Sequence, residues 1–199
     1  MPAKPLPDQL VQMGTFRTRD AENLGVSRQR LSDALARGTV ERDARGVYRI
    51  AGTEPDEYFQ YGVLARRGVP FVISLVSALR IHGMTEQLPS SLWITIPHGR
   101  HRPVGPGTHT ICTYQSEPAY SAFAEERDFG GFRAKVYSPA KTVADCFKFR
   151  GKVGLDVAIE ALHDGWRHRK FTTDGLMAAA RIDGVENVIR PYAMGMLVP

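Results

Sequence analysis

The chain has 199 residues, a formal net charge of +5, 43% hydrophobic residues and two cysteines. This length exceeds a typical domain of roughly 100 to 150 residues, so a small N-terminal module followed by a larger domain is the natural division. The N-terminus lacks the apolar core of a signal peptide, and no stretch approaches the roughly 18 to 20 apolar residues of a membrane span. Cys112 and Cys146 match no metal spacing, so we expect reduced thiols, no disulfide and no metal, in a soluble cytoplasmic protein.

The N-terminal module begins with two short helical segments. Residues Asp8–Met13 are expected to form the first helix. Thr18–Asn23 are expected to form the second, with Thr18 as the N-cap and Glu22 near the first turn. Leu24–Val26 then form a turn, because Gly25 tolerates the left-handed backbone between two helices.

A third helix is predicted over Ser27–Arg37. The Ser27 hydroxyl can satisfy a free backbone N–H at its start, and Gly38 fits the position just past its end. One stripe of this helix and of the preceding turn is apolar and must be buried against a neighbouring helix; it consists of Val26, Leu31, Ala34 and Leu35.

The opposite face of this third helix is polar and basic. It carries Ser27, Arg28, Gln29, Arg30 and Ser32. Arginine pairs with guanine, glutamine with adenine, and serine with either base in the major groove. In a helix-turn-helix, the N-terminal end of the second helix meets the bases. These five residues are therefore the candidate base-reading set.

A short hairpin follows and predicts the wing of a winged helix-turn-helix. Its strands are expected at 39–42 and 47–50, and Gly46 stands in the loop where a tight hairpin favours a positive φ. Three arginines on or beside the hairpin are placed to contact phosphates, which positions a protein on DNA without specifying sequence: Arg42, Arg45 and Arg49.

Winged helices also serve as protein–protein modules, and an arginine-rich helix face is often only solvated. The charge distribution favours DNA binding over these alternatives. Residues 1–52 carry a net charge of +3, residues 53–137 are neutral, and residues 138–199 carry +2. We therefore predict a winged helix-turn-helix DNA-binding domain over residues 1–52.

The remaining residues, 53–199, predict a second domain of the α+β class. A polar junction at 51–55 leads into a helix from Pro55 to Arg67 and an apolar segment, 70–82, that ends as a buried helix. Strands are expected at 92–96, 108–114 and 132–137, and helices at 139–149, from 153 or 154, from 173, and at 187–197, the last interrupted by Pro191. Helices packed on one side of a small antiparallel or mixed sheet follow from this order.

A positively charged loop lies between the first two of these strands, bracketed by Pro97 and Pro103. It carries Arg100, His101 and Arg102. These residues could form an additional nucleic-acid contact. We favour the simpler interpretation, an exposed hairpin loop with solvated charges.

The second domain offers few groups for catalysis. The conceivable catalytic residues are His82, His163, His168, Asp145 and Cys146, and none has a partner at a diagnostic spacing. Asp145 stands four residues after Lys141, which predicts an ion pair on the helix surface. We therefore expect no enzyme, no catalytic residues and no cofactor. The alternative is a nucleic-acid-processing enzyme that is targeted by its winged helix.

Three sequence blocks occur in an order that resembles a known family. They are RLSDALARGTVERDARGVYRI, ISLVSALRIHGMTEQLPSSLWITIP and VYSPAKTVADCFKF. The chain resembles, over roughly residues 10–165, the AbiEi-like antitoxins of type IV toxin–antitoxin systems. Residues from about Lys170 onward match nothing in this pattern.

The resemblance implies a transcriptional regulator that binds double-stranded DNA in the promoter of its own operon. It also implies a functional partner, a nucleotidyltransferase-type toxin, which the antitoxin counteracts without needing a stable complex. Carried over to this sequence, the reading helix is Ser27–Arg37 and the wing is Thr39–Ile50. The family supplies no catalytic residues.

Overall fold

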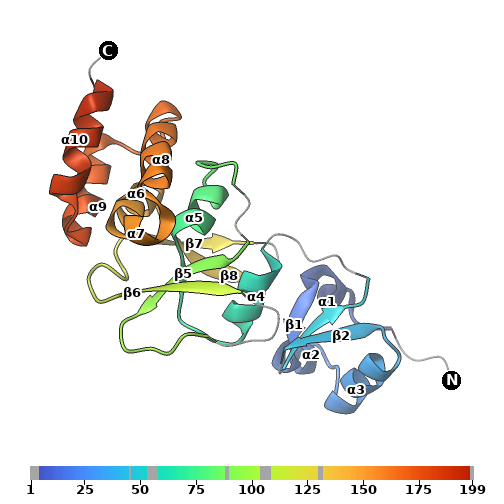
Figure 1. Cartoon of the computed structure of the whole chain (residues 1–199). Coiled ribbons are helices and arrows are strands. Elements are labelled where there is room, and N and C mark those ends of the chain that lie inside the picture. Colours follow the sequence, from blue (N-terminus) through green and yellow to red (C-terminus); the bar gives the residue numbers. More distant parts are fainter. Residues whose placement is uncertain are drawn as a thin grey trace. The chain divides into compact units, whose positions relative to one another are not determined.

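The structure is a computed structural model that describes residues 5–44, 46–52, 58–87, 90–103, 109–129 and 132–197. By their internal contacts the residues divide into two units. The first comprises Met1–Pro70, Pro103–Thr108 and Arg127–Ala134, and the second comprises Phe71–Arg102, His109–Glu126 and Lys135–Pro199. Figure 1 labels the elements of both units. Within the described ranges, no helix is long and apolar enough to cross a membrane.

The first unit has the element order of a winged helix-turn-helix. It contains α1 (Asp8–Met13), β1 (Thr15–Arg17), α2 (Thr18–Asn23), α3 (Arg28–Ala36), β2 (Val40–Ala44), β3 (Val47–Ile50) and α4 (Phe59–Arg66). The strands form an antiparallel sheet in the order β1-β3-β2. The buried core of this unit consists of Leu10, Phe16, Ala21, Val26, Leu31, Ala34 and Val40. The predicted helices and the wing are therefore confirmed.

Helix α2 has the predicted bounds, but its N-cap is one residue earlier than predicted. Thr18 is the first helical residue, and Arg17 is the N-cap. The backbone N–H of Arg17 donates to the Asp20 carboxylate at 2.7 Å. Thr18 could not take the cap position because it follows directly on β1, where Arg17 pairs with Val47 of the wing.

Helix α4 lies with the first unit. The guanidinium of Arg17 donates to the carbonyl of Ala65 at 2.6 Å, and Arg66 forms an ion pair with Asp20 at 2.9 Å. The first unit thus extends to Pro70, whereas the sequence placed the domain boundary at residue 52. The predicted start of this helix, at 55–57, lies outside the described residues.

The sheet of the second unit is mixed. It is built from β4 (Val72–Ile73), β5 (Leu92–Pro97), β6 (Thr110–Gln115), β7 (Ala124–Asp128) and β8 (Arg133–Tyr137), in the order β6-β5-β4-β8-β7. Strand β4 pairs antiparallel to β5 and parallel to β8, while β5 and β6 run parallel. A winged helix followed by an α+β unit with a mixed sheet confirms the predicted fold class.

The parallel pairing of β5 and β6 corrects the expectation of a hairpin loop between them. Leu92 aligns with Thr110, and Pro97 aligns with Gln115. Parallel neighbouring strands are joined by a crossover connection and not by a hairpin turn. The positively charged loop belongs to this crossover.

The helices of the second unit are α5 (Leu75–Ile81), α6 (Pro139–Lys148), α7 (Arg150–Val153), α8 (Leu155–Arg167), α9 (Thr173–Asp183) and α10 (Glu186–Leu197). Helices α6 and α9 start at the N-caps that the sequence predicted, Ser138 and Thr172, whereas α7 was not predicted. Ser138 accepts from the backbone N–H of Lys141 at 3.4 Å, and Thr172 accepts from that of Gly175 at 3.1 Å. Pro191 lies inside α10.

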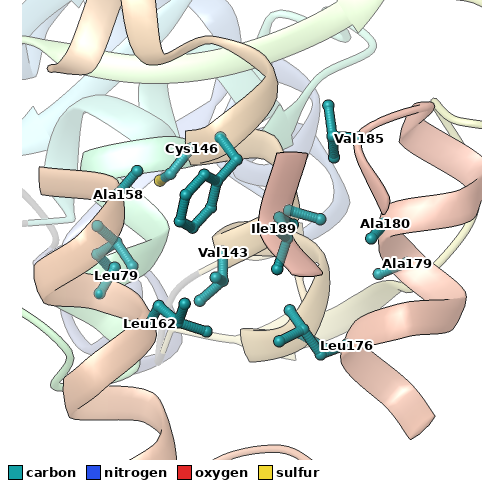
Figure 2. Close-up of a cluster of buried hydrophobic side chains, with 14 of the residues drawn as sticks. Leu79, Val143, Cys146, Ala158, Leu162, Leu176, Ala179, Ala180, Val185 and Ile189 are labelled. Carbon is teal, nitrogen blue, oxygen red and sulfur yellow. The ribbon is translucent and has the colours of Figure 1, made fainter. Parts of the chain in front are cut away.

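Five of these helices share one hydrophobic core, which Figure 2 shows in close-up. Each contributes buried side chains, for example Leu79 from α5, Val143 from α6, Leu162 from α8, Leu176 from α9 and Ile189 from α10. The segment from about Lys170 onward, which matched no sequence block, is thus an integral part of this core.

Candidate nucleic-acid interface

The exposed side of α3 is fixed by what its other side buries. Val26, Leu31 and Ala34 are at most 2% exposed. Because these positions face the core, the residues between them must face outward. Arg28, Gln29 and Ser32 are all exposed, at the N-terminal end of α3. We call these three residues the reading face.

Two residues of the reading face each donate to a carboxylate. Nε of Arg28 donates to Oε1 of Glu22, at the end of α2, over 2.7 Å, although the Arg28 side chain is 81% exposed. Nε2 of Gln29 donates to Oδ1 of Asp33, one helical turn later, over 3.0 Å. Neither Glu22 nor Asp33 was among the candidate DNA-binding residues. The spacing of Gln29 and Asp33 signals their contact, whereas the contact of Arg28 with Glu22 depends on the turn between the helices.

Ser27 and Arg30 have local structural contacts instead. The Ser27 hydroxyl accepts from the backbone N–H of Arg30 at 3.2 Å, which caps α3 as predicted. The guanidinium of Arg30 is half-buried and donates to the carbonyl of Pro5. Both residues therefore hold the start of α3 and the N-terminal segment in place.

The wing arginines lie in different surroundings. Arg42 on β2 is exposed, and no described residue forms a hydrogen bond or ion pair with its side chain. Arg49 on β3 is 15% exposed and pairs with Glu41 and, at 3.4 Å, with Asp43. Burial raises the pKa of Asp43, and the nearby Arg49 opposes that rise. Arg45 lies outside the described residues. Arg42 is thus open to phosphates, whereas Arg49 joins the two strands of the wing.

The positively charged loop belongs to the second unit. Arg100 and His101 are exposed, and the backbone N–H of Arg100 closes a turn on Pro97 at 3.1 Å. The guanidinium of Arg102 donates to the carbonyl of Thr110 at the start of β6. All three residues are exposed, and Arg102 also contacts the neighbouring strand.

The conceivable catalytic residues are dispersed. Nε2 of His82 lies 2.7 Å from the carbonyl of Tyr137, and Nδ1 of His168 lies 2.9 Å from that of Asp164. His163 is exposed beside an open pocket on α8 and α10. Cys146 is fully buried, which raises the pKa of its thiol. In the part of the chain that the structure describes, no group of three or more His, Cys, Asp or Glu could hold a metal ion.

Asp145 belongs to a buried cluster of charged side chains, not to a surface pair as predicted. Nζ of Lys141 lies 2.7 Å from Asp145 and 3.0 Å from Asp183, and all three side chains are 0% exposed. The contact of Lys141 with Asp145 was predicted correctly, but its environment was not. The i,i+4 spacing sets which side chains meet, whereas the packing of α9 over α6 decides whether water reaches them.

Two further polar side chains complete this cluster. Nε2 of Gln115 on β6 donates to Asp145 at 2.6 Å, and Nζ of Lys148 lies 3.4 Å from Asp183. Burial raises the pKa of Asp145 to about 7; Lys141 opposes this rise and Asp183 adds to it. Because Lys141, Asp145 and Asp183 have no exposed surface, the cluster offers no place for a substrate and serves to join α6, α9 and β6.

Comparison with known proteins agrees with the winged-helix architecture. Residues 8–51 match the family model described as "Transcriptional regulator, AbiEi antitoxin". The crystal structure of the RV2827C protein from Mycobacterium tuberculosis has a similar fold, with a TM-score of 0.55 and 13% sequence identity over 97% of this chain and 84% of that one. No curated protein matches the chain. The N-terminal module of this chain therefore matches an AbiEi antitoxin and transcriptional regulator domain, in agreement with the first of the three sequence blocks.

Proposed function

We propose that this protein is a DNA-binding antitoxin that represses its own operon and counteracts a nucleotidyltransferase-type toxin. In this proposal residues 1–52 bind the promoter, and residues 53–199 form a non-catalytic antitoxin domain. The observation that carries the DNA-binding part is the reading face, which presents base-reading side chains from a domain of a regulator family. The antitoxin part rests on the same family match.

The geometry supports a specific mode of binding. The N-terminal end of α3 enters the major groove, where Arg28 contacts guanine, Gln29 contacts adenine and Ser32 contacts a neighbouring base. Arg42 contacts a phosphate beside the groove, and we assign the same role to Arg45 from its place in the sequence. Arg49 supports this contact by holding the strands of the wing together.

A gel-shift experiment on the DNA upstream of its own gene tests the first half of the proposal. Wild-type protein should shift this DNA in preference to unrelated duplex. The combined change Arg28→Ala and Gln29→Ala should weaken binding by about 1 to 3 kcal/mol for each lost base contact. The control, Gln12→Ala with Arg190→Ala, removes the same residue types from α1 and α10 and should bind as the wild type does. Unchanged binding by the folded α3 variant would refute this mode of reading.

Co-expression with the toxin of the same operon tests the second half. The full-length variant with Arg28→Ala and Gln29→Ala should still protect cells, because the proposal assigns protection to the second domain. Both proteins are expressed from a foreign promoter, so that loss of repression does not alter their amounts. If protection disappears although the variant accumulates as folded protein, the two activities are not separable and this part of the proposal is wrong.

A further inference from the structure

We propose that Glu22 and Asp33 determine base specificity by orienting Arg28 and Gln29, an inference that rests on the proposed DNA-binding function. Each carboxylate accepts a hydrogen bond from one residue of the reading face, at 2.7 Å for Glu22 and 3.0 Å for Asp33. The two carboxylates are therefore positioning residues, which act on DNA through the side chains that they hold.

The contact of Arg28 with Glu22 leaves free the donors that guanine requires. A guanidinium has five N–H donors, and here the Nε–H is occupied by Glu22. The two terminal nitrogens remain available for the N7 and O6 acceptors of guanine, which lie side by side in the major groove. Fixing Nε also fixes the plane of the fork, so that less rotational freedom is lost when the bidentate contact forms.

The contact of Gln29 with Asp33 has the same logic. A glutamine amide offers two N–H donors and one carbonyl oxygen, and one N–H is occupied by Asp33. One donor and one acceptor remain, which match the N7 acceptor and the N6 donor of adenine. The contact also sets the direction of the amide, because the reversed amide would place its oxygen against the carboxylate. Asp33 therefore favours the arrangement that suits adenine.

The charge of these carboxylates supports a role in specificity over one in affinity. Two negative charges beside a surface that meets phosphates weaken binding to every DNA sequence. A gain in orientation offsets this cost only at the correct base pairs. The two carboxylates should therefore lower general affinity and raise discrimination.

Selection from a randomised duplex library, with the full-length protein, tests the inference. Glu22→Gln should reduce the preference for guanine at one position about five-fold or more, because orientation supports a contact that discriminates by roughly 5- to 150-fold. Asp33→Asn should reduce the preference for adenine at a different position. Binding to unrelated duplex should become stronger in both variants. Asp8→Asn, which removes an exposed carboxylate from α1, should leave both preferences unchanged.

Two further variants separate orientation from charge and from direct contact. Glu22→Asp keeps the charge but shortens the side chain, so it should lose discrimination without gaining affinity for unrelated DNA. In a protein that already carries Arg28→Ala, Glu22→Gln should cause no further loss of discrimination, because the residue that it orients is gone. If Glu22→Gln still changes base preference there, Glu22 reads a base directly and the inference is wrong.

The outcomes distinguish the inference from the function on which it rests. If the wild type enriches no sequence, sequence-specific DNA binding fails and the inference fails with it. If the wild type enriches a sequence, and Arg28→Ala relaxes it, but Glu22→Gln does not, the proposed function stands and the inference alone is overturned.

Discussion

Helices α3 and α6 each carry a polar pair at the same i,i+4 spacing, in opposite environments. Nε2 of Gln29 lies 3.0 Å from Asp33 on an exposed face. Nζ of Lys141 lies 2.7 Å from Asp145 where neither side chain has exposed surface. The same local rule therefore produces a surface contact in one unit and part of a buried charge cluster in the other.

This difference sets what each pair can do. Water competes for the exposed pair, so the pair adds little stability, but its spare donors stay available to a ligand. The buried charges have lost their hydration, so each must find its partners within the protein. We therefore expect substitutions in α3 to affect recognition, and substitutions in the buried cluster to affect folding.

The largest effect is expected from Asp183→Ala. Asp183 accepts from Lys141 at 3.0 Å and from Lys148 at 3.4 Å, so its removal leaves the buried Lys141 with one carboxylate in place of two and takes this carboxylate away from Lys148. Breaking a buried ion pair on one side costs about 3 to 5 kcal/mol. Urea unfolding measures this loss in the second unit, because both tryptophans, Trp93 and Trp166, belong to that unit.

Asp174→Ala is the matched control for this change. Asp174 is an exposed carboxylate in the first turn of the same helix, α9. Its loss should cost about 1 kcal/mol or less, through the helix dipole. An equal loss of unfolding free energy in the two variants would mean that the buried cluster stabilises the fold no more than an exposed carboxylate does.

A smaller effect is expected from Asp145→Asn, on how the stability of the protein depends on pH. The pKa of Asp145 is raised to about 7 in the folded state from its ordinary value of 3.8, so the folded protein binds more protons between these pH values. This contribution to stability is therefore present at acid pH and declines as the pH rises toward about 7. Asp145→Asn should flatten this decline. Urea midpoints of the wild type and the variant at about pH 5 and about pH 7 measure the decline. An equal decline in both proteins would contradict the role given to Asp145.

The next effect concerns Arg42, the exposed arginine of the wing. A plot of the logarithm of the binding constant against the logarithm of the salt concentration has a negative slope. Arg42→Ala should make this slope shallower by roughly one, as the loss of one phosphate contact does. Base preference should stay the same, because phosphate contacts position the protein without reading sequence. Binding titrations at several salt concentrations measure the slope, with Arg190→Ala as control. A changed base preference at constant slope would show that the wing reads bases.

The smallest effect is expected on stability from Asp33→Asn. The pair with Gln29 is exposed, so its loss should change the free energy of unfolding by about 0.5 kcal/mol or less. Thermal unfolding followed by circular dichroism measures this change. A loss as large as that caused by Asp183→Ala would remove the distinction between the two helices.

The sequence predicted the elements that carry strong local signals. Ser27, Ser138 and Thr172 each begin a helix in the structure as expected, because a hydroxyl at the N-cap acts over only three residues. Strands β1, β4 and β7 were not predicted, and β1 has only three residues. The two residues of β4 lie within a longer apolar run, and the sequence of β7, AEERD, lacks the usual strand-forming residues.

In the candidate site, too, local contacts could be predicted from the sequence and long-range contacts could not. The spacing of the apolar residues in α3 predicts that Arg28, Gln29 and Ser32 face outward, which the structure confirms. It cannot predict that Arg30 contacts Pro5, 25 residues away, because that contact depends on the path of the N-terminal segment. The burial of Lys141 likewise depends on Asp183, which is 42 residues away.

This separation of 42 residues also delays the folding of the second unit during synthesis. A ribosome that adds about 5 to 20 residues each second takes roughly 2 to 8 s to pass from Lys141 to Asp183. Once Lys148 has been added, all residues of α6 are present, but Lys141 lacks one of its two carboxylates until Asp183 follows. The reading face and the two carboxylates that contact it lie within residues 22–33, which are synthesised as one continuous stretch. A nascent chain therefore has all the residues of its reading face well before its second unit can fold completely.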